Sequence, residues 1–151
     1  MPHEIERKFL LKTIPPDLVK YPHYRIEQGY LMATPDGKQV RLRRTNCGCT
    51  LTFKTEEGAV REEREIEITA EQFGALWPAT AGQRLSKTRH KVPWKDLTIE
   101  VDVYAGINQG LTVAEVEFPD RATCQEFQPP DWFGEEVTDN ARYSNVVLAR
   151  E

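Results

Sequence analysis

Charged and apolar residues alternate with a period of two through much of the chain, and this alternation is typical of β-strands. In the first such run, Glu4, Glu6 and Lys8 fall on one face of the predicted strand. Six further segments repeat the pattern, through Arg41 and Arg43, Thr52 and Lys54, Arg61 to Glu67, Lys87 and Arg89, Glu100 and Asp102, and Glu115 and Glu117. The sequence therefore predicts a mainly β (α+β) fold of antiparallel strands with one charged face.

The charge on this face has two readings. On a single strand it is equally consistent with an ordinary solvated sheet face. However, neighbouring carboxylates such as Glu115 and Glu117 repel each other unless a cation or a basic side chain compensates them. Seven such strands favour an ionic ligand site. If the sheet curls with these faces inward, the enclosed space is too charged for an apolar core and must hold water, metal and a polyanion.

Helix caps and turn residues separate the strands. Thr69 and Gln72 form a capping box, and Pro78 ends the helix that follows. Asp120 and Thr138 are the predicted N-caps of a second and a final helix. We expect these helices to cover the apolar exterior of the sheet. The predicted turns lie at residues 35–37, 46–48 and 57–58.

Composition narrows the class of protein. The 151 residues fit a single domain spanning 1–151, and the net charge of -4 argues against bulk binding of nucleic acid. No apolar run approaches the length of a membrane span or of a signal peptide, so we expect a cytoplasmic protein that binds neither nucleic acid nor membranes. Three cysteines are an odd number, which favours reduced thiols. Cys47 and Cys49 lack a second cysteine pair or adjacent histidines that would complete a zinc site.

Taken in order, the charged motifs resemble those of the CYTH superfamily, the triphosphate tunnel metalloenzymes, over essentially the whole chain. The matching motifs are Glu4-x-Glu6-x-Lys8, Arg41-x-Arg43, Leu51-Thr52-Phe53-Lys54, Arg61-x-Glu63-x-Glu65, Lys87-Thr88-Arg89, Glu100-x-Asp102 and Glu115-x-Glu117. One such motif alone is weak, because three charged residues at period two occur by chance in many edge strands. Seven such motifs in the order typical of the family are a specific sign of it.

The resemblance implies a closed eight-stranded antiparallel β-barrel, the tunnel, with a few covering helices. Such a tunnel binds a triphosphate together with Mg²⁺ or Mn²⁺. Compact bacterial members that resemble this chain in residues 28–31 and 132–138 are typically inorganic triphosphatases, which hydrolyse tripolyphosphate to diphosphate and phosphate. The protein would be a monomer or a homodimer acting on a small polyanionic substrate.

The same resemblance suggests a role for each charged residue, and the chemistry of phosphate and metal supports it. The substrate-binding bases are Lys8, Arg41, Arg43, Lys54, Lys87 and Arg89. The metal-binding carboxylates are Glu4, Glu6, Glu63, Glu65, Asp102, Glu115 and Glu117. The catalytic residues are Glu4, Glu6, Lys8 and Lys87. In this hypothesis Glu4 or Glu6 activates the attacking water, and Lys8 or Lys87 stabilises the leaving diphosphate.

Three other positions are ambiguous or structural. His90 falls out of phase with Lys87 and Arg89, which favours a surface or packing role over catalysis. Tyr30 either donates a hydrogen bond to phosphate or packs at the end of the barrel. The last helix, with Arg142, lies where some relatives place a plug over one tunnel mouth.

Alternative functions share the basic residues. A class IV-type adenylate cyclase would hold ATP in the same tunnel, with the ribose hydroxyl replacing water as nucleophile. Thiamine triphosphatase, or another nucleoside or organic triphosphatase, would need a platform for the organic group, and Trp94 or Trp132 offers an aromatic face. A non-catalytic polyphosphate-binding module would use the bases without turnover, but the many carboxylates disfavour it.

Overall fold

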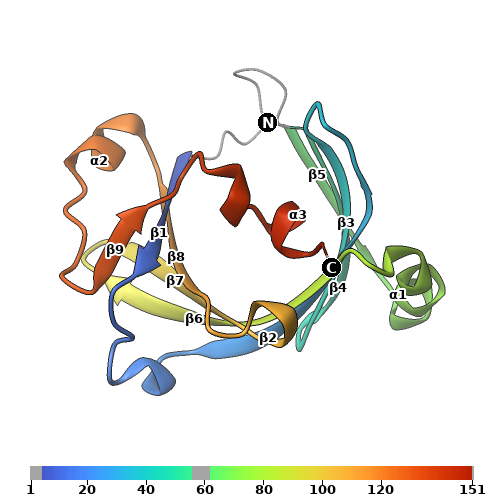
Figure 1. Cartoon of the computed structure of the whole chain (residues 1–151), viewed down its shortest axis with the longest axis horizontal. Coiled ribbons are helices and arrows are strands. Elements are labelled where there is room, and N and C mark those ends of the chain that lie inside the picture. The colour runs from blue at the N-terminus through green and yellow to red at the C-terminus, as the bar shows by residue number, and fades with distance from the viewer. Residues whose placement is uncertain (1–4, 56–61, 151) are drawn as a thin grey trace. The chain divides into compact units, whose positions relative to one another are not determined.

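A computed structural model describes residues 5–55 and 62–150 of the chain (Figure 1). Most of these residues lie in strands. The elements in chain order are β1 (Ile5–Leu11), η1 (Leu18–Lys20), β2 (His23–Ala33), β3 (Lys38–Thr45), β4 (Gly48–Thr55), β5 (Glu62–Ile68), α1 (Ala70–Leu76), η2 (Trp77–Thr80), β6 (Arg84–Trp94), β7 (Leu97–Tyr104), η3 (Gly106–Asn108), β8 (Thr112–Phe118), α2 (Arg121–Glu126), β9 (Phe133–Glu136), η4 (Ala141–Tyr143) and α3 (Asn145–Leu148).

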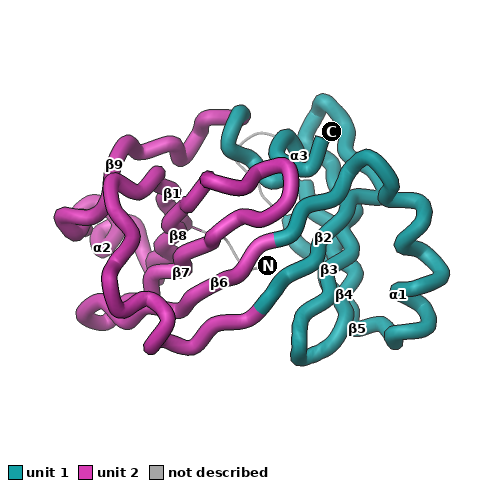
Figure 2. Tube along the Cα trace, turned by 60° about the horizontal axis from the view of Figure 1, so that its bottom comes forward, with its two compact units in different colours: residues 1–3, 25–86, 142–151 teal, residues 4–24, 87–141 magenta. Residues whose placement is uncertain are grey.

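The chain divides into two compact units, coloured teal and magenta in Figure 2. Of the described residues, unit 1 contains 25–55, 62–86 and 142–150, and unit 2 contains 5–24 and 87–141. The strand order is β5-β4-β3-β2 in unit 1 and β6-β7-β8-β1-β9 in unit 2. All of the strand pairs with a described register are antiparallel. The prediction of a mainly β, antiparallel fold with few helices is confirmed.

Unit 1 has its apolar core on one face of its sheet. Leu42 of β3 and Cys49 of β4 are buried against Phe73 of α1, and Leu51 packs at the edge of the same cluster. Phe73 also stacks on Trp77, with ring centroids 4.9 Å apart. Helix α1 therefore covers the apolar face, as predicted for the helices.

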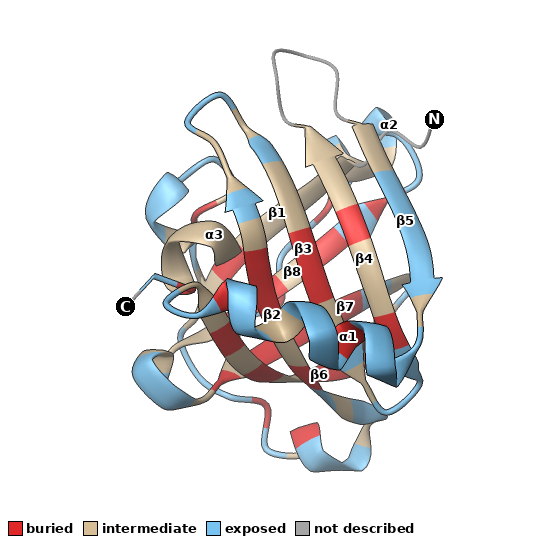
Figure 3. Cartoon of the chain, turned by 90° about the vertical axis from the view of Figure 1, so that its right-hand side faces the viewer, coloured by how far each residue is buried: buried red, intermediate tan, exposed pale blue. Residues whose placement is uncertain are grey.

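Strand β5 is less buried than its neighbours, as Figure 3 shows by its pale blue colour. Ile66 lies on the apolar side of the alternation in this strand, but it is 60% exposed. β5 stands at the end of the strand order of unit 1, and within the described residues it pairs with β4 alone. An end strand has only one hydrogen-bonded neighbour to shield it, which explains why the apolar side of the alternation stays in solvent here.

Unit 2 buries its core on the apolar face of β7, β8 and β1. Val101 and Val116 are fully buried, and Phe9 packs beside them. Phe127, directly after α2, lies 6.2 Å from the ring of Phe9 and 5.3 Å from that of Phe118. Because the strands alternate, Lys8, Asp102 and Glu115 of the same strands face the other way.

Two of the three predicted helix caps are confirmed. Thr69 Oγ1 accepts from the backbone N–H of Gln72 at 3.0 Å, and Gln72 Oε1 accepts from that of Thr69 at 2.9 Å. Asp120 Oδ1 accepts from the backbone N–H of Thr123 at 2.7 Å. These side chains satisfy N–H groups that the first turn of a helix leaves without partners.

The third predicted cap is wrong. Ser144, not Thr138, caps α3, and its hydroxyl accepts from the backbone N–H of Val147 at 3.3 Å. The hydroxyl of Thr138 donates to Glu136 at 2.6 Å and accepts from the backbone N–H of Lys8 at 3.1 Å. Thr138 therefore joins β9 to β1.

The short strand β9 raises the number of strands in the described residues to nine, where eight were expected. It pairs with β1 through Phe9 and Glu136 and through Leu11 and Phe133. Arg7 donates two hydrogen bonds to the Glu136 carboxylate, at 2.9 and 2.7 Å. These bonds lower the pKa of the Glu136 carboxyl. Closure of the strands into a barrel stays a prediction, and the predicted turn at 57–58 lies outside the described residues.

Gly29 of β2 gives a sharp test of packing in unit 1. A Cβ atom at this position would lie 2.7 Å from the Cβ and Oγ1 atoms of Thr80, whereas one at Gly74 in α1 would meet no atom within 4 Å. We expect Gly29→Ala to lower the free energy of unfolding by about 1–3 kcal/mol through overpacking. Gly74→Ala, the matched control, should raise it by up to about 1 kcal/mol because alanine favours a helix interior. Denaturant unfolding of both variants checks this, and equal effects would contradict it.

No helix in the described part of the chain is both long and apolar enough to cross a membrane.

Candidate functional site

In unit 2 the charged residues of the predicted motifs lie on the face of β6, β7, β8 and β1 that is opposite its core. The register sets Arg89 against Asp102, Glu100 against Glu115, and Lys8 against Glu115. Directly opposed residues on antiparallel strands have Cβ atoms close enough for their side chains to interact. The predicted motifs of these four strands are thus brought together on one surface.

Asp102 holds two of the bases in this cluster. Its Oδ2 atom accepts from Lys87 Nζ at 2.7 Å, and Arg89 donates from Nε to Oδ1 at 2.8 Å and from a terminal nitrogen to Oδ2 at 2.9 Å. The side chains of Lys87 and Asp102 are 0% and 1% exposed. Burial opposes the charged carboxylate, but the charges of Lys87 and Arg89 outweigh it and lower the pKa of Asp102. The Asp102 carboxyl is therefore charged at neutral pH.

Glu115 occupies the middle of the same surface. Lys8 Nζ lies 3.3 Å from its carboxylate, and the Glu115 side chain is 14% exposed. Burial again works against the charge, but the charges of Lys8, Lys87 and Arg89 together outweigh it and lower the pKa of Glu115. Glu100, opposite Glu115 on β7, is compensated from its other side by Lys91 at 3.1 Å and by Arg89 at 3.5 Å. This explains how two opposed carboxylates are tolerated.

Glu6 and Glu117 form a second pair of directly opposed carboxylates, on β1 and β8. Like charges at opposed positions repel each other. A bound divalent cation would relieve this repulsion, and carboxylate oxygens are the ligands that Mg²⁺ and Mn²⁺ prefer. The donor chemistry of the pair therefore fits the expected metal. Glu4, the remaining acid of the first motif, lies outside the described residues.

Unit 1 presents a charged face of its own, on the side of its sheet opposite Leu42 and Phe73. Gln28 Oε1 accepts two bonds from Arg43, at 2.9 and 2.7 Å, and Gln28 Nε2 donates to the hydroxyl of Tyr30 at 2.9 Å. Gln28 and Tyr30 are both buried. A neutral amide thus orients the guanidinium of Arg43 without cancelling its charge.

Arg41 has a different environment from Arg43. It is buried, and its one side-chain bond within residues 5–55 and 62–150 is a long one of 3.4 Å to the hydroxyl of Thr52. Its Nε atom is buried without a hydrogen-bond partner, and none of the described carboxylates forms an ion pair with it. A buried cation with an unpaired donor is costly unless an anion binds it. Arg41 is therefore equipped to bind an anionic ligand.

The remaining predicted residues of unit 1 lie on β4 and β5. Lys54 is opposite Glu63, and their charged atoms are 3.8 Å apart. Glu65 is opposite Thr52 and is exposed. Over the described residues, no three His, Cys, Asp or Glu side chains gather closely enough to form a metal site. The assignment of individual metal ligands stays a prediction, and the carboxylate oxygens of Asp102 are engaged by Lys87 and Arg89.

Comparison with known proteins identifies the family. A model of the CYTH domain matches residues 2–146. The chain belongs to the CYTH family. This CYTH chain is 46% identical over 149 residues to an inorganic triphosphatase of Nitrosomonas europaea, covering 97% of this chain and 96% of the relative. It is 37% identical over 153 residues to an inorganic triphosphatase of Acetivibrio thermocellus, covering 99% of this chain and 95% of the relative.

A solved structure agrees with these sequence relatives. The crystal structure of an inorganic triphosphatase matches the CYTH chain with a TM-score of 0.76 and 43% identity, covering 99% of this chain and 95% of that one. The family resemblance inferred from the charged motifs is thus confirmed.

Sequence reasoning missed Gln28 as a member of the charged surface of this CYTH protein. It named the segment around Gln28 but gave the residue no role, because a neutral side chain does not register in a pattern of charges. The signal that could have identified Gln28 was its position two residues before Tyr30, which places both residues on one face of β2, opposite Arg43 and Arg41.

His90 is buried and its ring lies 5.0 Å from that of His23. Burial, followed by the neighbouring His23, lowers the pKa of His90, so the predicted packing role fits.

Proposed function

We propose that this chain is an inorganic triphosphatase, a hydrolase that cleaves tripolyphosphate to diphosphate and phosphate. Its similarity over nearly its whole length to two proteins of that name supports the activity. The structural observation that carries the proposal is Arg41, a buried guanidinium with an unpaired Nε atom and no described carboxylate beside it. Such a group favours a ligand of high negative charge.

The bases of each unit fit different tasks in holding phosphate. Arg43, fixed by Gln28, presents a rigid guanidinium, whose shape matches two phosphate oxygens at once. Lys87 and Arg89 of unit 2 are both hydrogen-bonded to Asp102, so their positive charges are held in fixed positions. Preorganised charge of this kind stabilises a developing negative charge without further rearrangement.

The proposed metal is Mg²⁺ or Mn²⁺, and Glu6 and Glu117, with Glu4, are the carboxylates that would hold it. When bound, it would offset the charge of the phosphates and favour their attack by water. Glu6 or Glu4 is the proposed acceptor of the proton from that water. Lys8, which lies beside Glu115, is the proposed partner of the leaving diphosphate, and Lys87 is the second choice.

One alternative substrate is weakened by the position of the tryptophans. Trp94 and Trp132 pack against the apolar core of unit 2, whereas Lys87 and Arg89 alternate onto the opposite face of β6. An organic group whose triphosphate bound those bases would not reach either indole. This disfavours thiamine triphosphate and leaves adenylate cyclase activity as the second candidate.

A side-by-side turnover screen tests the proposed function. Tripolyphosphate, ATP, thiamine triphosphate and diphosphate would each be incubated with the protein and with Mg²⁺, with Mn²⁺ or with EDTA. We expect metal-dependent release of phosphate and diphosphate, fastest from tripolyphosphate. Formation of cyclic AMP from ATP would instead identify a cyclase, and binding of tripolyphosphate without turnover would identify a binding module.

The proposed setting of the protein is the cytoplasm. The three cysteines are free in the structure and would stay reduced there.

A further inference from the structure

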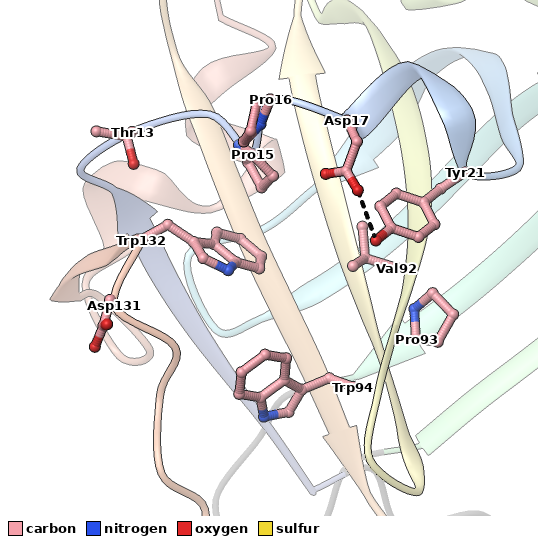
Figure 4. A pocket seen from close by; sticks show the side chains of 10 residues that line it. All are labelled: Thr13, Pro15, Pro16, Asp17, Tyr21, Val92, Pro93, Trp94, Asp131 and Trp132. Carbon is pink, nitrogen blue, oxygen red and sulfur yellow. Dashed lines mark hydrogen bonds between the residues drawn. The ribbon is translucent and has the colours of Figure 1, made fainter.

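A cavity of about 490 Å³ opens in unit 2, lined by none of the charged residues of the candidate functional site. It is shown in Figure 4. The described residues that line it are Thr13, Pro15, Pro16, Asp17, Tyr21, Val92, Pro93, Trp94, Asp131 and Trp132. Its volume falls within the range of sites that bind small molecules, about 300–1,000 Å³.

The cavity lies on the core side of the unit 2 sheet. Val92 and Trp94 alternate on β6 with Lys91 and Arg89, so the two pairs face opposite sides of the strand. Val92 belongs to the apolar core, and Trp94, Trp132 and Tyr21 pack against that core. A ligand in this cavity is therefore separated by the sheet from any phosphate bound to Arg89.

Three aromatic rings and two carboxylates shape the chemistry of the cavity. Figure 4 shows the indoles of Trp94 and Trp132 toward one side and Tyr21 with Asp17 toward the other. The Tyr21 hydroxyl donates to Asp17 at 3.3 Å. Asp131 makes no hydrogen bond or ion pair with any other described side chain, and none of the described lining residues is basic.

Each of these features selects for positive charge. The faces of tryptophan and tyrosine rings attract cations, most strongly ammonium groups that carry little water. Two carboxylates at the rim add Coulomb attraction and repel anions such as phosphate. Apolar walls of proline and valine favour a cation with carbon substituents over a hydrated metal ion.

We propose that this cavity is a binding site for a small organic cation, an alkylated ammonium compound, distinct from the proposed triphosphate site. The two indoles contact the cation's methyl or methylene groups, and Asp17 and Asp131 compensate its charge. The site extends the protein's ligands beyond polyphosphate and does not depend on its hydrolase activity.

Choline and its uncharged carbon analogue, 3,3-dimethylbutan-1-ol, are the matched probes. Both have the same shape, so their difference isolates the charge. Titration followed by ¹H–¹⁵N spectra should shift the indole signals of Trp94 and Trp132 and leave that of Trp77, which lies in unit 1, unchanged. We expect the neutral analogue to bind about tenfold more weakly or not at all.

Variants keep the test independent of folding. Asp17→Asn and Asp131→Asn remove one charge each and should weaken choline binding about threefold or more, whereas Asp139→Asn, an exposed aspartate outside the cavity, should leave it unchanged. Matching spectra away from the cavity verify that each variant is folded. Absence of choline binding, equal binding of the neutral analogue, or equal behaviour of the three variants would each overturn the proposal.

Discussion

Replacing Asp102 with asparagine will lower the free energy of unfolding by about 3–5 kcal/mol. The substitution keeps the shape of the side chain but leaves Lys87 and Arg89 buried without the carboxylate that they share. A buried charge that loses its partner retains the full cost of desolvation, and this explains the expected size of the effect. Equilibrium unfolding in urea measures it.

Glu100→Gln is the matched control for this substitution. Glu100 also forms an ion pair with Arg89, but at 3.5 Å, and its side chain is 26% exposed. Solvent screening reduces the contribution of such a pair to the free energy of unfolding to about 0–1 kcal/mol. If the two substitutions cost the same, the buried carboxylate is not the centre of this cluster.

The dependence of stability on pH should follow the same residue. The pKa of Asp102 is lower in the folded protein than the value of about 3.9 in an unfolded chain. The folded state therefore gains stability from Asp102 at every pH above about 4, and this gain is lost as the pH falls further toward the folded pKa. Urea unfolding at pH 7 and at pH 3 should show a smaller difference for Asp102→Asn than for the unchanged protein.

Glu6→Gln should reduce the turnover of tripolyphosphate by about 100-fold or more, within the range that a lost general base produces. The amide keeps nearly the same shape, but it cannot take a proton from water and it is a weaker metal ligand than a carboxylate. The substitution also removes one of the two like charges that are opposed on β1 and β8, which changes the stability of the folded state independently of catalysis. Steady-state release of phosphate, with stability measured in parallel, separates the two effects.

Glu126→Gln supplies the control for the change of charge, because Glu126 is an exposed residue at the end of α2. Its turnover should match that of the unchanged protein. Near-normal turnover in both Glu6→Gln and Glu4→Gln would rule out the proposed roles of the first motif, while leaving the family membership untouched.

Much of this fold could be predicted from the sequence because its strands obey one simple rule. The alternation of Glu115 and Glu117 with Val116 fixes which side of β8 is buried, and Val116 is fully buried as that rule requires. The capping box at Thr69 was equally readable, because it depends only on residues three apart.

Other features depend on contacts between distant segments, which local patterns do not encode. Threonine is a common helix cap, but the hydroxyl of Thr138 forms hydrogen bonds with Glu136 and with the backbone N–H of Lys8 instead. Asp102 has the chemistry of a metal ligand, and only the pairing of β6 with β7 sets it against Arg89 and beside Lys87. The polarity of a residue was therefore easier to predict than its partner.

Apolar and charged side chains lie on opposite faces of β8, and this limits which mutations the strand can accept. Deleting one residue near its middle would shift every following side chain to the other side of the sheet, turning a glutamate into the hydrocarbon interior and a valine toward the ionic surface. Substitution can adjust such a strand gradually, but a change of length cannot. Natural variation in length should accordingly be confined to the connecting loops.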